Sequence, residues 1–172
     1  MKITMRIANI EDVIDISYIG RKTFDQSFGH LFTDRNDLIR YLEQTFSIKK
    51  LKKSIVKSNN IYWIVFSDDI AVGYAKIQLN APSPFIQLPN TCKLQKIYIL
   101  KEYASKGIGV QLQELIFDTA ITNGCEIIWL SVLKSNEKAI RFYKNNRYKV
   151  VGEHPFTIGK ENFEFSLMSR SL

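Results

Sequence analysis

The stretch KLQKIYILKEYASKGIGV, residues 93–110, decides the fold of this chain. Residues 94–100 are rich in isoleucine, leucine and tyrosine, as expected for a strand buried on at least one face. Residues 102–106 form a short polar loop, after which the pattern predicts a helix that starts at Gly107 and Gly109. The sequence therefore predicts a strand that passes through a glycine turn into a helix.

The helix after this turn has one apolar face, and Gly124 is placed to end it as a C-terminal cap. Its apolar positions recur at helical spacing and comprise Ile108, Leu112, Leu115, Ile116 and Thr119.

The start of this helix is suited to binding an anion. Its first backbone N–H groups have no partner inside the helix, and the helix dipole places partial positive charge there. Because Gly107 and Gly109 have no β-carbon, a phosphate can reach the backbone closely. A tight strand-to-helix turn without any ligand carries the same glycines, so the turn alone leaves both interpretations open.

Composition favours a single globular domain over residues 1–172, with a net charge of +7 that favours anionic partners. Cys92 and Cys125 lack metal-binding spacing, and two histidines are too few for a zinc centre, so we expect no metal. The N-terminus shows no secretion signal, and no stretch approaches membrane-spanning length. We therefore expect a soluble, cytoplasmic protein without a membrane partner.

One dense lysine cluster lies at Lys49, Lys50, Lys52 and Lys53. A helix with its apolar residues on the other side would place this cluster in water, and we interpret it as a solvated face. No aromatic residues alternate with the lysines, so we expect no nucleic-acid partner.

The remaining pattern predicts an α/β protein, an α+β mixed sheet in one domain. Strands are expected at residues 3–8, 61–66, 70–79, 94–100, 126–133, 148–152 and 163–168, and helices after Asn9, after Asp34, up to about residue 57, after Gly107 and over 136–145. Asp34 and Asp37 fit a capping box. This order predicts a twisted, mostly antiparallel sheet with helices on both faces and one central parallel strand-helix-strand unit.

A second informative segment is SVLKSNEKAIRFYKNNRY, residues 131–148. Asn136 and Tyr143 are seven residues apart and share a helix face, with the small Ala139 between them. A slender ligand could lie across this face between an amide and a phenol. The alternative from these residues alone is that Tyr143 and Phe142 serve only in packing.

Together, ASKGIGV and NEKAIRFYKNNRY resemble the two coenzyme A segments of the GNAT superfamily of N-acetyltransferases. The stretches RKTFDQSFG, IYILKEYASKGIG and IWLSVLKSNEKAIRFYKNNRY are similar to bacterial spermine/spermidine acetyltransferases of the PaiA type. The resemblance covers most of the chain and implies acetyl-coenzyme A as co-substrate.

The resemblance also implies roles for individual residues. Backbone groups of residues 97–99 would pair with the pantetheine arm, the turn would hold the pyrophosphate, and Tyr143 would protonate the departing thiolate. The cofactor-binding residues so implied are Ile97, Tyr98, Ile99, Ser105, Lys106, Gly107, Ile108, Gly109, Val110, Asn136, Ala139, Phe142 and Tyr143.

Three positions depart from the family pattern. Ala104 stands where the family's turn usually opens with Gln or Arg, which removes one side-chain contact to phosphate. Lys93 occupies a central-strand position where many relatives carry a carboxylate, so the general base is open; Asp25, Glu43 or no side chain are the alternatives. Arg147 replaces the usual glycine after the second helix, so we expect the turn at residues 145–146 to take over its role.

The sequence thus favours direct transfer of an acetyl group to the primary amine of a small molecule, with polyamines as the first acceptor to consider. The net charge of +7 argues mildly against a polycation. Acetylation of a protein or peptide amine and a non-catalytic regulatory role are the alternatives, and a homodimer through an edge strand stays open.

Overall fold

The computed structural model describes residues 1–172, and its elements follow the predicted order. The strands are β1 (Ile3–Ile7), β2 (Asn60–Ser67), β3 (Ile70–Gln78), β4 (Thr91–Ile99), β5 (Ile127–Leu133), β6 (Lys149–Ile158) and β7 (Glu161–Ser171). The helices are α1 (Val13–Phe28), α2 (Arg35–Phe46), α3 (Ile48–Ile55), α4 (Ile108–Thr122) and α5 (Glu137–Asn145), with short 3-10 turns η1 (Ile10–Asp12), η2 (Gly29–Leu31) and η3 (Lys101–Tyr103).

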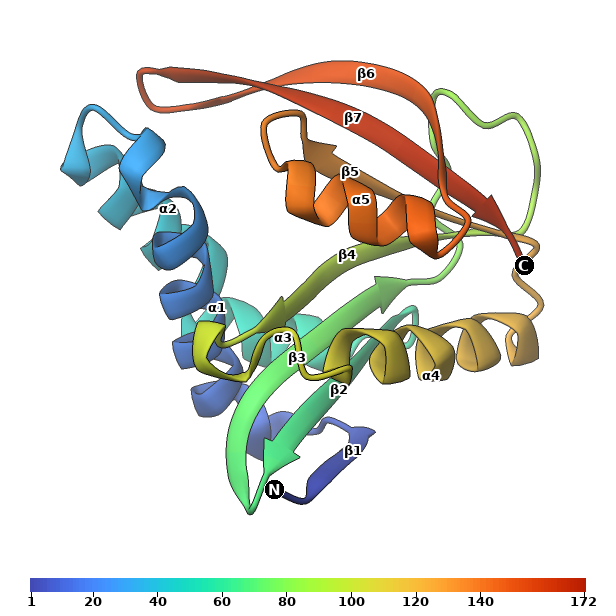
Figure 1. Ribbon diagram of the computed structural model, residues 1–172, viewed down its shortest axis with the longest axis horizontal. Coiled ribbons are helices and arrows are strands. Elements are labelled where there is room, and N and C mark those ends of the chain that lie inside the picture. The colour runs from blue at the N-terminus through green and yellow to red at the C-terminus, as the bar shows by residue number, and fades with distance from the viewer.

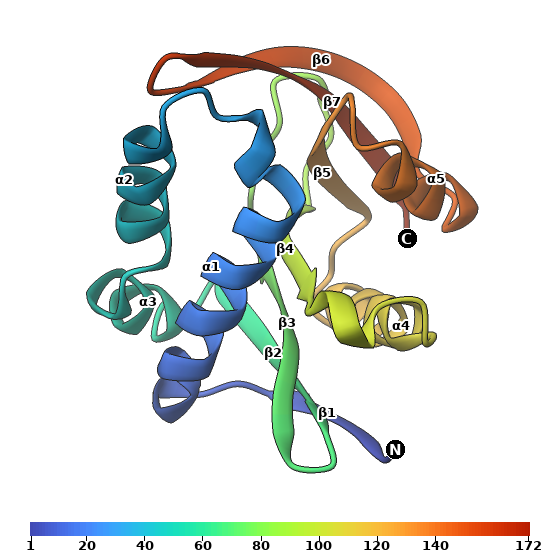
Figure 2. The same cartoon turned by 60° about the vertical axis from the view of Figure 1, so that its left-hand side comes forward.

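All seven strands form one sheet in the order β1-β2-β3-β4-β5-β7-β6 (Figure 1). Every neighbouring pair is antiparallel except β4 and β5, which run parallel across the α4 crossover. Figure 2 shows α1, α2 and α3 on one face of the sheet and α4 and α5 on the other. The predicted mixed sheet, its helices on both faces and its central parallel unit are therefore confirmed.

The parallel pair separates soon after it forms. Only three residue pairs join the two strands, from Thr91 with Ile127 to Lys93 with Trp129. Two residues after Lys93, β4 has a bulge at Gln95 against β3. Lys76 pairs with Lys96 and Ile77 pairs with Leu94, so Gln95 is left without a partner in β3. Beyond this bulge β4 and β5 diverge, as Figure 1 shows. The edges that face each other across the gap are left without a strand partner.

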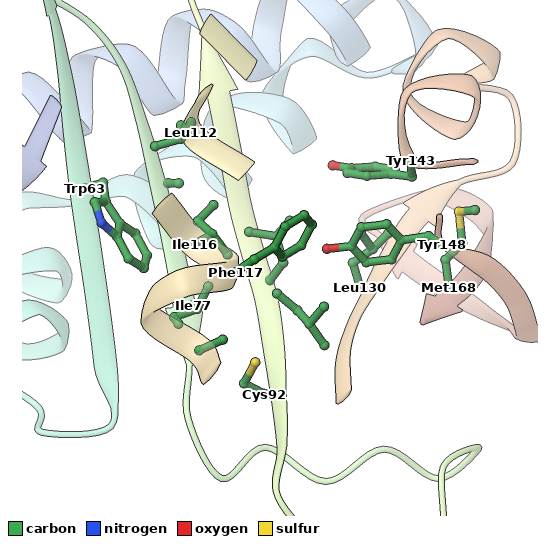
Figure 3. Packing of buried hydrophobic residues seen from close by; sticks show 14 of the residues in the cluster. Trp63, Ile77, Cys92, Leu112, Ile116, Phe117, Leu130, Tyr143, Tyr148 and Met168 are labelled. Carbon is green, nitrogen blue, oxygen red and sulfur yellow. The ribbon is translucent and has the colours of Figure 1, made fainter. Parts of the chain in front are cut away.

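Two buried clusters hold the helices on the sheet. On the α4 face, Leu112 and Ile116 pack against Ile77 and Leu130, together with Tyr143 from α5 (Figure 3). On the opposite face, residues of α1 and α3 pack against Tyr62, Ile64 and Tyr74 of the sheet. Burial of this apolar surface is the main force that keeps the two layers together.

The apolar face of α4 is rotated slightly from the predicted one. Ile108, Leu112 and Ile116 are fully buried as predicted, whereas Leu115 is 38% exposed. The adjacent positions Gln113, Phe117 and Ala120 face the core instead, because helical periodicity defines the direction of a face only to within about one residue. The end of the helix is as predicted: Gly124 follows it with a φ of +78°.

The strand at the N-terminus is one residue shorter than the predicted range of residues 3–8. Ile3 and Met5 pack against the α4 cluster, but Ile7 is 55% exposed. Since β1 lies at the edge of the sheet, its last residue reaches beyond the buried cluster.

The last two strands are much longer than predicted and form a hairpin that extends over α2 (Figures 1 and 2). Asp37 was expected to complete a capping box with Asp34; instead it is buried and accepts a hydrogen bond from the Lys160 N–H at 2.9 Å. Asp34 alone caps the helix, with its carboxylate 2.9 Å from the Asn36 N–H. Asp37 thus ties the hairpin turn to α2.

The turn after α5 also differs from the expectation. Arg147 itself adopts the left-handed conformation, with a φ of +65°, so the expected substitution by residues 145–146 is wrong. Its N–H donates to the Lys144 carbonyl, and the Tyr148 N–H donates to the Tyr143 carbonyl, both at 3.0 Å. These two bonds form a Schellman motif with arginine in the place of glycine.

Candidate active site

A cleft of about 740 Å³ opens where β4 and β5 diverge. One side is formed by the turn before α4 and by α5, and the other by α1, α2 and the β6–β7 hairpin. Eleven of the residues implied as cofactor-binding line it, namely Ile97, Tyr98, Ile99, Ser105, Gly107, Gly109, Val110, Asn136, Ala139, Phe142 and Tyr143. Segments that lie far apart in the sequence therefore meet at one site.

The turn before α4 presents an uninterrupted row of free backbone donors. The N–H groups of residues 105–110 have no hydrogen-bond acceptor in the protein, and the first satisfied one is Gln111, which donates to Gly107 at 3.2 Å. Ser105 and Gly107 both have positive φ angles, of +61° and +77°. Alternating handedness of this kind turns successive N–H groups toward one centre, which suits a phosphate group.

Two of the implied cofactor residues have side chains outside the cleft. Ile108 is buried in the α4 core, and the Lys106 ammonium lies 5.2 Å from the centre of the Tyr103 ring. Both residues therefore face the turn through their backbone N–H groups alone. The loss of a side-chain contact at Ala104, which lines the cleft, leaves this row of donors intact.

The free edge of β4 forms the floor of the cleft. The Leu100 N–H donates to the Val72 carbonyl of β3 at 2.8 Å. Because backbone groups alternate along a strand, those of Tyr98 also face β3, whereas those of Ile97 and Ile99 face the gap. An extended ligand with amide groups can add to this edge as a further strand would. Tyr98 instead contributes its side chain.

Tyr143 projects from α5 toward the floor of the cleft. Its side chain is only 9% exposed, and its hydroxyl has no hydrogen-bond partner in the protein. Burial, with a smaller contribution from Tyr98, raises the pKa of Tyr143 well above its usual value. The phenol is therefore protonated throughout the neutral range and available as a donor.

Asn136 and Gly109 shape the wall around this tyrosine. The Asn136 side-chain oxygen caps α5 by accepting from the Ala139 N–H at 3.2 Å, which leaves its amide N–H groups for a ligand. A β-carbon at Gly109 would come within 3.4 Å of the Phe142 ring. The space between α4 and α5 at this position is thus filled by a single β-carbon and has no room for a branched side chain.

Neither Asp25 nor Glu43, the two residues considered for the general base, lines the cleft, and Lys93 does not line it either. Asp25 is bound by both arms of Arg35, at 3.0 and 2.7 Å, and Glu43 is exposed on α2. The Lys93 ammonium lies 4.6 Å from the centre of the Trp129 ring. No carboxylate is among the 31 residues around the cleft.

Lys96 is the ionisable residue that sequence reasoning missed. Its ammonium lies 5.3 Å from the centre of the Phe46 ring and 5.6 Å from that of Tyr98, and burial lowers its pKa. The available signal was a lysine directly before the apolar run at residues 97–100. Its position places an amino group, with no carboxylate beside it, at the floor of the cleft.

Aromatic side chains form the end of the cleft opposite the helix turn. Phe24 and Phe28 of α1, Tyr41 of α2 and Phe163 of β7 all line it. Phe24 also belongs to a buried cluster with Leu38 and Phe46, so the aromatic segment at residues 24–32 serves both the core and the pocket. This end has room for a second molecule beside a ligand on the strand edge.

The cleft thus combines a row of free backbone donors, an open strand edge and an aromatic end, which suits a long ligand with a phosphate-bearing end. The chain belongs to the acetyltransferase (GNAT) family, whose profile matches residues 25–146. Proteins of this family use acetyl-coenzyme A as co-substrate, and the chain is an N-acetyltransferase of this type. The free donors and the strand edge described above fit that co-substrate.

Individual relatives agree with this assignment. The chain is 26% identical to the uncharacterised N-acetyltransferase in the pepI 3′ region of Lactobacillus delbrueckii subsp. lactis, over 94% of this chain and 93% of that one. It is 35% identical to the thialysine N-epsilon-acetyltransferase of Mus musculus over 51 residues, 30% of each chain. The PaiA N-acetyltransferase of Thermoplasma acidophilum, solved with coenzyme A, has a TM-score of 0.80 at 20% identity over 100% of both chains.

No helix combines the length and the apolar character needed to cross a membrane.

Proposed function

We propose that this protein transfers the acetyl group of acetyl-coenzyme A to the primary amine of a small molecule by direct attack of the amine on the thioester. The observation that carries the proposal is the convergence, in one cleft, of the free N–H groups at residues 105–110, the open edge of β4 and the unpaired Tyr143 hydroxyl. Neither cysteine is available as a nucleophile, because Cys92 and Cys125 are buried in the core.

In this proposal Tyr143 handles the proton at the leaving group. The hydroxyl donates to the sulfur as the carbon–sulfur bond breaks, and the attacking amine loses one proton as the amide forms. Because burial raises the pKa of Tyr143, a lasting phenolate is unfavourable, and the proton lost by the amine restores the phenol. The products are the acetylated amine and the free thiol, so one proton is moved and none is consumed.

The acceptor must reach the cleft as a neutral amine. A free alkyl amine with a pKa near 10.4 is mostly protonated at pH 7, and its deprotonation costs about 4–5 kcal/mol. Burial lowers the pKa of Lys96, and the same low polarity and aromatic surroundings favour the neutral form of an incoming amine over its ammonium form. These groups perform part of the work of a general base without accepting the proton themselves.

Polyamines remain one candidate acceptor through the resemblance to PaiA-type enzymes. A polycation would need carboxylates along its length, and the cleft lining contains none. Amines with at most one net positive charge, including amino acids such as lysine and thialysine whose carboxylate offsets one of their two ammonium groups, fit the lining better. We therefore treat spermine and spermidine as reference compounds and not as the leading acceptors.

The proposal is tested by following thiol release from acetyl-coenzyme A with a panel of spermine, spermidine, lysine, thialysine, aminoalcohols and short peptides. We expect saturable turnover with at least one small primary amine, together with its acetylated product by mass spectrometry. Tight acetyl-coenzyme A binding with turnover only on peptides would contradict a small-molecule acceptor.

A further inference from the structure

A second pocket, which we call the basic pocket, lies between α3 and the adjoining ends of β2, β3 and β4. It has a volume of about 580 Å³ and no hydrophobic residue among the 11 that line it. Its lining residues are Ser47, Lys49, Lys50, Lys53, Ser54, Lys57, Asn59, Asn60, Lys76, Gln78 and Gln95. Five ammonium groups and several hydroxyl and amide groups therefore surround one space that contains no carboxylate.

The lysines of the basic pocket have no counter-charge in the protein. All six ion pairs of the chain involve other residues, and none of the five pocket lysines takes part in one. Like charges held together in this way repel one another, so the arrangement is unfavourable unless an anion enters. The basic pocket is therefore built for a negatively charged group.

Lys76 shows how unfavourable a positive charge is inside the basic pocket. It is half-buried on β3, and its ammonium lies 5.4 Å from the centre of the Tyr62 ring. Burial, followed by repulsion from Lys96, Lys50 and Lys57, lowers the pKa of Lys76 to about 8. A buried anion would reverse this shift by stabilising the charged ammonium.

The lysine cluster of α3 is exposed at all four positions, as its interpretation as a solvated face predicts, and three of its members also line the basic pocket. Lys49, Lys50 and Lys53 of α3 line the basic pocket together with Lys76 from the sheet, whereas Lys52 on the same helix does not. Figure 2 shows α3 beside β2, which brings these lysines to the sheet. Lys52 can therefore serve as the control when the pocket-lining lysines of the same helix are substituted.

The basic pocket adjoins the catalytic cleft. Gln95, the extra residue of the β4 bulge, lines both spaces, and the next residue, Lys96, lines the cleft. Gln95 also donates to the Gln78 side chain at 3.3 Å, so the bulge joins the floor of one space to the wall of the other. The two spaces therefore meet at Gln95, which lines both of them.

We propose that the basic pocket binds the anionic end, of phosphate type, of an acceptor whose amine enters the cleft. This inference rests on the proposed acetyl transfer and names the class of acceptor: a primary amine joined by a short chain to a phosphate-like group. It also explains why a strongly basic protein lacks carboxylates at the acceptor end. Such an acceptor carries one amine and one anionic group, whereas a polyamine carries several positive charges and no anionic group.

The first test measures binding of inorganic pyrophosphate by calorimetry to protein saturated with coenzyme A. Saturation occupies the donors at residues 105–110, so remaining binding reports the basic pocket. We expect one site, weakened about tenfold or more in the Lys50→Met/Lys76→Met double variant and unchanged in Lys52→Met/Lys149→Met, which removes the same charge from two exposed lysines outside both spaces. Absence of pyrophosphate binding to the saturated protein, or equal loss of binding in both double variants, would overturn the proposal.

The second test compares aminoalkyl phosphates of two to six carbons with the aminoalcohols of the same length as acceptors. We expect one chain length at which the phosphate raises kcat/KM by about tenfold or more, a gain lost in Lys50→Met/Lys76→Met and kept in Lys52→Met/Lys149→Met. Equal turnover of phosphates and alcohols at every length would overturn this inference and leave the acetyl transfer standing. Turnover of none of these amines nor of the wider panel would instead count against the proposed function.

Discussion

The rings of Tyr143 and Tyr148 meet almost edge to face, with centroids 5.5 Å apart and planes at 64°. Figure 3 shows the two rings extending side by side into the core. The contact exists because the Tyr148 N–H donates to the Tyr143 carbonyl at 3.0 Å, which folds the chain back at the end of α5. The ring that carries the proposed catalytic hydroxyl is thereby held in place by the turn that follows it.

The conformation of that turn predicts a stabilising substitution. Arg147 has a φ of +65°, which costs a residue with a β-carbon about 1 kcal/mol relative to glycine. We expect Arg147→Gly to raise the free energy of unfolding by roughly 0.5–1 kcal/mol and to leave acetyl transfer unchanged. Urea denaturation measures the effect.

The control for this substitution is Lys144→Gly, which lies within α5 and should lower the free energy of unfolding by about 1 kcal/mol. A lower stability for Arg147→Gly, with an unchanged dependence on urea, would show that the arginine side chain contributes more than its backbone conformation costs.

The turn before α4 predicts the behaviour of Gly109. A β-carbon added there would lie 3.4 Å from the Phe142 ring and 3.7 Å from Ile99, so alanine should fit with small adjustment and valine should not. We expect coenzyme A affinity to fall modestly in Gly109→Ala and by about a hundredfold or more in Gly109→Val, because the branched side chain displaces the wall beside the free N–H groups. Calorimetry on folded variants provides the measurement.

Ile121→Val serves as the comparison on the same helix, since Ile121 is exposed and lies at the far end from the turn. Wild-type affinity in a folded Gly109→Val variant would contradict the assignment of this turn to the pyrophosphate.

The lowered pKa of Lys76 predicts a pH-dependent stability. The folded-state pKa of about 8 is below the unfolded value of 10.5, so the unfolded chain binds more protons between these pH values and stability rises with pH across that window. At pH 7 the charged lysine carries its full burial penalty. Lys76→Met should therefore stabilise the protein by about 1 kcal/mol at pH 7, after allowance for solvent screening, and by progressively less as the pH rises toward 10.5.

Thermal unfolding of Lys76→Met and wild type at pH 7 and pH 9.5 measures this difference, with the exposed Lys52→Met as the control for general charge effects. Equal stabilisation at both pH values would show that the gain comes from packing and not from ionisation. Loss of stability at pH 7 would contradict a destabilising charge at this position.

Local signals in the sequence predicted most of the fold. The helix start after Asn9 and the end of α4 at Gly124 depend on neighbouring residues only, and both are present. The long β6–β7 hairpin was underestimated, because β6 is mostly exposed and lacks a clear apolar alternation. Its contact with α2 through Asp37 joins residues far apart in the chain.

The site was predictable only in part, because some of its features depend on contacts between residues far apart in the chain. The glycine turn and the α5 face are continuous in sequence, and their residues do meet in the cleft. The divergence of β4 from β5 depends on the bulge at Gln95, and the basic pocket depends on the register that places Lys76 near α3. Neither register nor bulge position leaves a mark in the periodicity of a single strand.

The most direct test of the account is steady-state thiol release by wild type and Tyr143→Phe with acetyl-coenzyme A and the best amine of the panel. Phenylalanine keeps the ring contacts with Tyr148 and removes only the hydroxyl, so the fold and coenzyme A affinity should be preserved. We expect kcat to fall by about a hundredfold or more with little change in the KM for acetyl-coenzyme A. An unchanged kcat, with the chemical step shown to limit the rate, would contradict the role of Tyr143 as the proton donor in this cleft.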